Sequence, residues 1–142
     1  MNKRIVGLDL GEKTLGVAIS DPLNITAQGL KTITFASKSY KKATTLLKEL
    51  LQDIEVDKFV LGYPLSMNGT ITESAQRSLA YKKRLESIFH VEVVLFDERF
   101  SSVLVNKLMI AADVRREKRK KIIDCLAAVN ILQGYLDANR GS

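Results

Sequence analysis

Residues 5–20 constrain the fold most, because they contain two apolar runs, the first of which has an acidic residue inside it. A short turn at residues 11–14 separates the runs, so they predict two strands joined as a hairpin. Asp9 lies inside the first run, between Leu8 and Leu10, where a buried charge without a partner would be costly. Asp9 is therefore either a functional carboxylate or an acid that the pleat turns to solvent, and this stretch alone allows both interpretations.

Composition and charge narrow the class of protein. With 142 residues, 46% of them hydrophobic, the chain is long enough for one domain with a core. Its net charge of +6 favours an acidic partner, most readily nucleic acid. The single cysteine, Cys125, excludes an internal disulfide. The sequence has no signal-peptide core and no uncharged apolar run of the roughly 18 residues that a membrane helix needs. We therefore expect a cytoplasmic protein without a membrane segment.

Strand and helix patterns alternate over the next part of the chain. A third strand is predicted over residues 29–35, and Ser37 or Ser39 then caps an amphipathic helix that continues to Ile54. A short apolar run at residues 57–61 predicts a buried strand. The first three strands follow one another closely, so we expect them to be antiparallel.

The second half of the chain begins with a helix signal. Thr70 and Glu73 have the spacing of a capping box, which predicts a helix that starts there and ends near His90. The elements predicted after it are a strand over residues 91–96, a helix that Ser101 or Ser102 caps and that ends at Ala112, and a final helix from Ile123 onward.

This order of elements predicts an α/β fold with one mixed sheet. We expect five strands, three antiparallel strands followed by two parallel ones, with helices on both faces. No internal repeat or linker divides the sequence. The chain is therefore expected to form a single domain over residues 1–138, with a short flexible tail over residues 139–142.

Further acidic residues lie where the predicted strands end. Asp97 and Glu98 follow the last strand, and Asp124 lies on the apolar stripe of the final helix. Three or four carboxylates at one sheet edge repel one another unless a cation lies between them. Mg²⁺ and Mn²⁺ prefer oxygen ligands of this kind, as in metal-dependent phosphodiester hydrolysis. The alternative for Asp97 and Glu98 is a salt bridge with Arg99 at the strand end.

Basic and polar residues near these acids are candidates for nucleic-acid binding. The run at residues 115–121 has six basic residues in seven and is either a phosphate-binding segment or a solvated loop. The loop before Thr70 offers amide and hydroxyl groups for a nucleic-acid backbone, unless it merely turns the chain. Arg99 either stabilises charge at a reacting phosphate or pairs with Asp97. We expect nucleic-acid contacts from Asn68, Thr70, Arg99, Arg115, Arg116, Lys118, Arg119 and Lys120, and only structural roles for His90 and Cys125.

Four motifs of the sequence resemble the YqgF (RuvX) family of Holliday junction resolvase-like proteins, in the RNase H-like superfamily. They occur in the same order and span nearly the whole chain. The motifs are Gly7-Leu8-Asp9-Leu10-Gly11 with Gly16-Val17-Ala18, Val60-Leu61-Gly62-Tyr63-Pro64-Leu65 with Asn68-Gly69-Thr70, Asp97-Glu98-Arg99-Phe100-Ser101-Ser102, and Asp124-Cys125-Leu126-Ala127-Ala128 with Ile131-Leu132-Gln133. The resemblance implies an RNase H-like fold. It also implies a nuclease site of Asp9, Glu98 and Asp124 that binds Mg²⁺ or Mn²⁺ and acts on branched DNA or in 5′ maturation of the 16S rRNA precursor.

The sequence departs from the wider superfamily at one acid. That superfamily often has its second acid at the end of the fourth strand, where this chain has Gly62, Tyr63 and Pro64. Glu98, one strand later, takes its place, with Asp97 as the rival. The similar RuvC-type resolvases have four carboxylates, so the number of bound metal ions, one or two, stays open.

Two other functions compete with the nuclease. A non-catalytic RNA-binding ribosome-assembly factor is the main alternative, although binding alone would not need acids such as Asp9 and Asp124 on apolar faces. The segment from Asp9 to Gly16 also resembles the phosphate loop of ATP-binding actin-like modules, which resemble two such domains closed around a nucleotide. A chain of 142 residues supplies one such domain. The sequence leaves open whether the protein is a monomer or a homodimer.

Overall fold

The computed structural model describes residues 3–98 and 116–139, and its last helix has described side chains from Leu126 onward. The elements are β1 (Arg4–Leu10), β2 (Thr14–Ser20), β3 (Ala27–Thr34), α1 (Tyr40–Leu50), β4 (Val56–Tyr63), α2 (Glu73–Phe89), β5 (Glu92–Asp97) and α4 (Arg116–Asn139).

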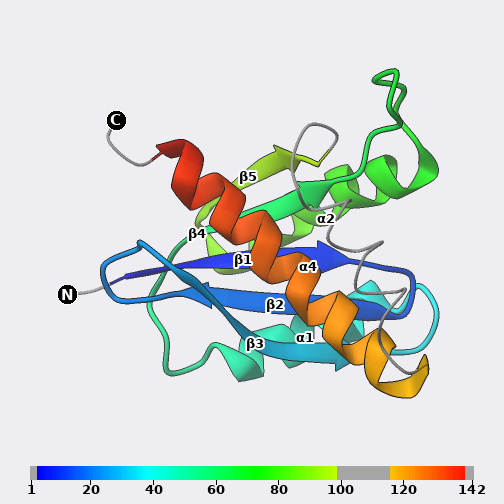
Figure 1. The fold of residues 1–142 in the computed structure, drawn as a ribbon. Helices are drawn as coiled ribbons and strands as arrows, with labels where there is room; N and C mark the ends of the chain where they lie inside the picture. The colour runs from blue at the N-terminus through cyan, green and yellow to red at the C-terminus, as the bar shows by residue number, and fades with distance from the viewer. Residues whose placement is uncertain (1–2, 99–115, 140–142) are drawn as a thin grey trace.

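The strands form one five-stranded sheet in the order β3-β2-β1-β4-β5. The pairs β1–β2 and β2–β3 are antiparallel, whereas β1–β4 and β4–β5 are parallel. Helices α1 and α2 cover one face of the sheet and α4 crosses the other (Figure 1). The predicted mixed sheet with helices on both faces is thus confirmed.

The alternation of side chains along β1 divides the core into two layers. Val6 and Leu8 belong to the larger cluster, beneath α1 and α2. Ile5 belongs to the smaller cluster, which includes Ala128 and Leu132 of α4. Since strand side chains alternate between faces, every second residue of β1 from Ile5 lies on the side of α4.

Gly7 allows α4 to lie directly against β1. A Cβ atom at Gly7 would lie 2.6 Å from Cβ of Leu132 and 2.9 Å from the backbone oxygen of Ala128. Because one of these atoms belongs to the helix backbone, rotation of a side chain would not relieve the overlap. The helix reaches this depth because position 7 has no side chain.

We expect Gly7→Ala to destabilise the fold, because α4 must move away from the sheet. Overpacking of this kind costs about 1 to 3 kcal/mol, which lowers the melting temperature by about 3 to 10 °C for a chain of this length. Thermal unfolding followed by circular dichroism measures the change. Gly11→Ala is the control, since its Cβ would meet the Thr14 side-chain oxygen at 3.1 Å and the Thr14 backbone oxygen at an ordinary contact distance of 3.4 Å. Equal melting temperatures for the two variants would contradict the close packing.

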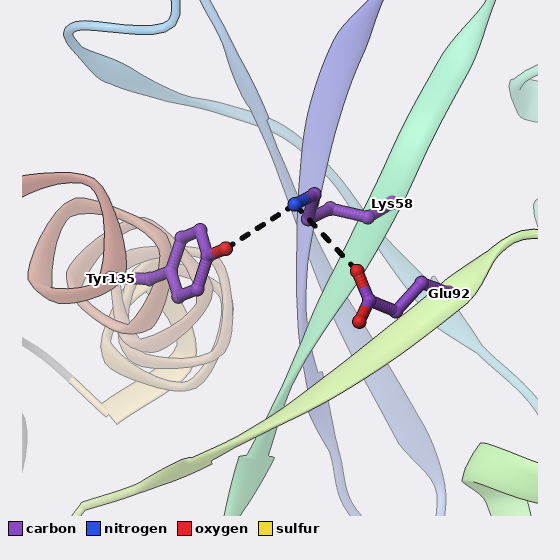
Figure 2. Close-up of polar contacts among 3 residues, drawn as sticks. All are labelled: Lys58, Glu92 and Tyr135. Atoms are coloured by element: carbon purple, nitrogen blue, oxygen red, sulfur yellow. Dashed lines mark hydrogen bonds and ion pairs between the residues drawn. The ribbon is translucent and has the colours of Figure 1, made fainter. Parts of the chain in front are cut away.

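Lys58 links the last turns of α4 to the amino ends of β4 and β5. Figure 2 shows its amino group between Tyr135 of α4, with Nζ 3.5 Å from the hydroxyl oxygen, and Glu92 of β5, 3.6 Å from Oε1. Burial opposes the charge on Lys58, but Tyr135 and Glu92 raise its pKa overall. These contacts lie at the amino end of β4, so they position α4 from the end of the sheet opposite to the acids.

The predicted capping box is wrong. Helix α2 begins one position after Thr72, whose side chain accepts a hydrogen bond from the amide of Ala75, so Glu73 is the first helical residue. The Thr72 hydroxyl donates to the carbonyl of Pro64, which fixes this threonine at the helix start. Thr70 instead closes a turn with Ser66. The predicted helix end is confirmed, because His90 is the C-cap, with a φ of 56°.

The last helix is longer than predicted at both ends. It begins at Arg116, so most of the basic run is helical rather than a loop, and it continues through Asn139, beyond the predicted tail boundary. Asn139 bonds back to the carbonyl of Tyr135, which supports this final turn. The helix predicted to end at Ala112 lies outside the described residues. In the described part of the chain, no helix is long and apolar enough to cross a membrane.

Candidate active site

The carboxyl ends of three neighbouring strands meet at one edge of the sheet. β1, β4 and β5 run parallel, so Leu10, Tyr63 and Asp97 end them on the same side. Ligands of open α/β sheets commonly bind at this kind of edge. Asp9 and Glu98 lie within one residue of these strand ends, as the sequence predicted.

Asp9 lies on the face of the sheet that α4 covers. It is two residues after Gly7, which contacts α4, and it is only partly exposed. Its partner on β2 is Gly16, which has no side chain to fill the space beside the carboxylate. The acid inside the apolar run therefore faces the α4 side, close to the carboxyl end of β1.

Glu98 is a buried carboxylate that reaches over β4. Its relative exposure is 8%, and its Oε2 lies 3.0 Å from the place where a Cβ of Gly62 would be. Leu8 of β1 pairs with Leu61 of β4. Asp9 and Gly62 each come one position later, so they lie beside one another on the two strands. Neighbouring strands are about 4.8 Å apart, so the carboxylate of Glu98 lies one strand away from Asp9, on the same face.

Asp97 lies on the other face of the sheet. It pairs with Tyr63 in the register of β4 and β5, whereas Phe96, one residue earlier, packs against Gly134 of α4. Because side chains alternate along a strand, Phe96 and Glu98 share the α4 side and Asp97 points away from it. The two adjacent acids are therefore not equivalent, and only Glu98 shares a face with Asp9.

The backbone of Asp124 lies one helical turn before Ala128 in α4. Along the helix, Leu132 and Ala128 lie over Gly7, so four further residues lead toward the end of β1 that carries Asp9. Four helical residues advance about 6 Å along α4, which brings the backbone of Asp124 toward the same end of the sheet as Asp9. Among the side chains that the structure describes, no three His, Cys, Asp or Glu residues form a metal-binding group. The side chain of Asp124 is outside that set.

The candidate nucleic-acid residues divide into three groups. Asn68 and Thr70 lie in the loop between β4 and α2, which projects beyond the sheet edge (Figure 1). Asn68 Oδ1 accepts hydrogen bonds from the amide and hydroxyl of Thr70, at 3.0 and 2.6 Å, so the turn is held internally. Arg116, Lys118, Arg119 and Lys120 belong to the first turns of α4, and Arg99 and Arg115 lie outside the described residues.

Gly62 is the site residue that the sequence interpretation missed. The Gly-Tyr-Pro segment suggested that the strand ends at Leu61, whereas β4 continues through Tyr63 and carries Gly62 into the sheet. A Cβ there would also meet Cδ1 of Ile131 at 2.7 Å. A glycine inside an apolar strand is itself a signal for close approach, and here Glu98 and α4 are what approach.

The sequence matches one known protein family over nearly its whole length. The sequence model of the RuvX family, described as Holliday junction resolvase, matches residues 3–138. A Bacillus subtilis (strain 168) protein, provisionally named pre-16S rRNA nuclease, is 51% identical over 135 residues, which cover 95% of this chain and 98% of that protein. A Geobacillus protein with the same name is 47% identical over 137 residues, with coverage of 96% and 99%.

Solved structures support the fold. RuvC of Thermus thermophilus in complex with a Holliday junction substrate has a TM-score of 0.62 at 14% identity and covers 98% of this chain and 96% of its own. The fowlpox virus Holliday junction resolvase has a TM-score of 0.59 at 13% identity, with coverage of 95% and 99%. At such identities the likeness shows that the RNase H-like fold of resolvases is shared.

Proposed function

The chain belongs to the RuvX family of Holliday junction resolvases, and on that premise we propose that it hydrolyses phosphodiester bonds of nucleic acid with a site formed by Asp9, Glu98 and Asp124. The observation that supports this site best is the position of Glu98 over Gly62. It brings a buried carboxylate to the face and edge where Asp9 lies. A binding protein would have no need for two carboxylates beside one another on an apolar face.

The donor set fits a divalent metal ion. Carboxylate oxygens are the ligands that Mg²⁺ and Mn²⁺ prefer, and Gly62, on the strand between the two acids, has no side chain to separate them. Asp9, Glu98 and Asp124 would hold the ion. When bound, such an ion activates water and stabilises the charge that develops on the phosphate.

The surrounding residues would bind and orient the substrate. The projecting loop with Asn68 and Thr70 lies at the same sheet edge, and its hydroxyl and amide groups can contact a sugar-phosphate backbone. The basic residues Arg116 to Lys120 precede Asp124 in the same helix, so they approach the site from the α4 side. Arg99 would place positive charge directly after Glu98.

The relatives that cover nearly the whole chain favour precursor 16S rRNA as the substrate. They are about half identical to this chain and carry the pre-16S rRNA nuclease name. We infer that the enzyme trims the 5′ region of that precursor in the bacterial cytoplasm. The homodimer that the sequence left open is not needed here, because one chain supplies all three acids.

Cleavage of end-labelled substrates tests the proposal. We expect the purified chain to cut a transcript that spans the 5′ end of mature 16S rRNA in Mg²⁺ or Mn²⁺, and to stop when a chelator is added. A four-way DNA junction, assayed in parallel, reports whether the family description also applies to this chain. Tight binding of the transcript without cleavage in either metal would instead support the non-catalytic assembly factor.

A further inference from the structure

A groove that the function above does not use runs between α1 and α2. It consists of two adjoining hollows with volumes of about 360 and 500 Å³, which share Lys38, Tyr40 and Arg84. We call it the cationic groove, because its lining contains five basic residues and one acid, Glu73. The basic residues are Lys38, Lys41, Lys42, Arg77 and Arg84.

The cationic groove opens at the same sheet edge as the acids, on the opposite face. β3 runs parallel to β1 because each is antiparallel to β2, so α1 and α2 both begin near the edge where β1 ends. The segment before α1 is fixed to the β1–β2 turn, since the amide of Lys38 donates to the carbonyl of Glu12 at 2.9 Å. The Ser37 hydroxyl also donates to the Glu12 carboxylate at 2.6 Å and lowers the pKa of that acid.

In the part of the chain that the structure describes, no ion pair neutralises a basic residue of the groove. Within the described ranges, the ion pairs are Lys58–Glu92 and Lys82–Glu86, and neither involves a residue of the groove. An exposed basic face is often merely solvated. Here, however, five cations surround one concave surface, and an anionic chain could contact several of them at once.

Tyr40 adds an aromatic surface among these charges. It is partly exposed, and its ring makes edge contacts with Phe35 at a centroid distance of 5.9 Å and with Tyr81 at 6.3 Å. The Tyr81 hydroxyl in turn accepts a hydrogen bond from Thr44, which fixes Tyr81 and thereby supports the ring of Tyr40. A fixed aromatic ring within a cationic groove is the arrangement on which unpaired bases stack.

We propose that the cationic groove binds a single-stranded segment of the nucleic acid whose phosphodiester bond is cut at the acidic site. This inference rests on the proposed function. Phosphates contact Lys38, Lys41, Lys42, Arg77 and Arg84, and a base stacks on Tyr40. The segment crosses the β1–β2 turn, because that turn separates the two faces at the shared edge.

Removing positive charges at matched positions inside and outside the groove tests whether its basic residues bind phosphates. The variant Lys42→Ala/Arg84→Ala removes two groove cations, and Lys48→Ala/Lys83→Ala removes two exposed cations of the same helices outside the groove. We measure binding of a labelled single-stranded RNA in the presence of a chelator, over a range of salt concentrations. The RNA has about 20 nucleotides, which is longer than the site that one domain usually covers. We expect the groove variant to reduce the salt slope by about 1.4, or about 0.7 for each phosphate contact.

Tyr40 provides a test that does not depend on charge. We expect Tyr40→Leu to weaken binding of the same RNA at least about fivefold, which corresponds to about 1 kcal/mol of lost stacking, and Tyr40→Phe to leave it unchanged. Melting curves of both variants show whether the fold is retained. A fully paired RNA of equal length should show no difference between the two variants, because its bases are not free to stack.

The outcomes separate the groove from the nuclease site. Equal effects of the two double variants, or equal binding by Tyr40→Leu and Tyr40→Phe, would overturn the groove even if the parent cleaves RNA. Groove-dependent binding by a parent that cleaves neither substrate would support the binding surface and overturn the proposed function. Because binding is measured in a chelator, loss of cleavage cannot imitate either result.

Discussion

Glu98→Gln should lower the rate of phosphodiester cleavage by at least about 100-fold, whereas Asp97→Asn should leave it nearly unchanged. The loss corresponds to about 2.7 kcal/mol, which is within the stabilisation that a metal site gives to a developing charge. The two substitutions each remove one negative charge from adjacent residues. They differ because Glu98 reaches over Gly62 toward Asp9, while Asp97 lies on the other face of the sheet.

Single-turnover cleavage with enzyme in saturating excess over substrate measures this difference without a contribution from binding. Asp9→Asn should match Glu98→Gln, because it removes the carboxylate from the neighbouring strand. Binding of the RNA in a chelator should persist in all three variants, since basic residues rather than acids contact the phosphates. A larger loss of cleavage rate for Asp97→Asn than for Glu98→Gln would show that the reaction takes place on the α2 side of the sheet.

Gly62→Ala should reduce cleavage by about 10- to 100-fold while the chain remains folded. The added Cβ would lie 3.0 Å from Oε2 of Glu98 and 2.7 Å from Cδ1 of Ile131, and both are ends of flexible side chains. Those side chains can move aside, so the main consequence is a displaced carboxylate. Small displacements of catalytic groups commonly cost this much in rate.

Gly134→Ala is the matched control for Gly62→Ala. Its Cβ would meet Cζ of Phe96 at 2.7 Å, so it crowds the same interface of sheet and α4, away from the carboxylates. We expect similar, moderate changes in melting temperature for both variants and a loss of cleavage only for Gly62→Ala. If both variants lose cleavage equally, general loosening of α4 rather than the position of Glu98 sets the rate.

Most of the fold could be predicted because its elements have strong local patterns. The apolar runs of β1 and β2 and the helical spacing of α1 and α2 are confirmed in the structure, although α1 ends at Leu50 rather than at Ile54. The errors occurred where a distant contact decides between local choices. Thr70 and Thr72 both suit a helix cap, and the carbonyl of Pro64 selects Thr72.

The candidate site was harder to predict than the fold, since sequence carries no distances. The choice between Asp97 and Glu98 depends on the register of β4 and β5, which no pattern within β5 reveals. Gly62 resembled a turn residue because a tyrosine and a proline follow it. The cationic groove joins residues of α1 and α2, so only the folded chain brings Lys42 and Arg84 together, which are 42 positions apart in the sequence.

The contact between Gly7 and α4 fixes the position of the helix relative to the end of the sheet where the acids lie. Backbone atoms of α4 lie directly against Gly7, so the helix cannot shift along β1 or move away from it without losing this packing contact. Lys58 and Tyr135 restrain the far end of the same helix. The backbone of Asp124 belongs to this helix, so contacts outside the proposed acidic site determine its distance from Asp9.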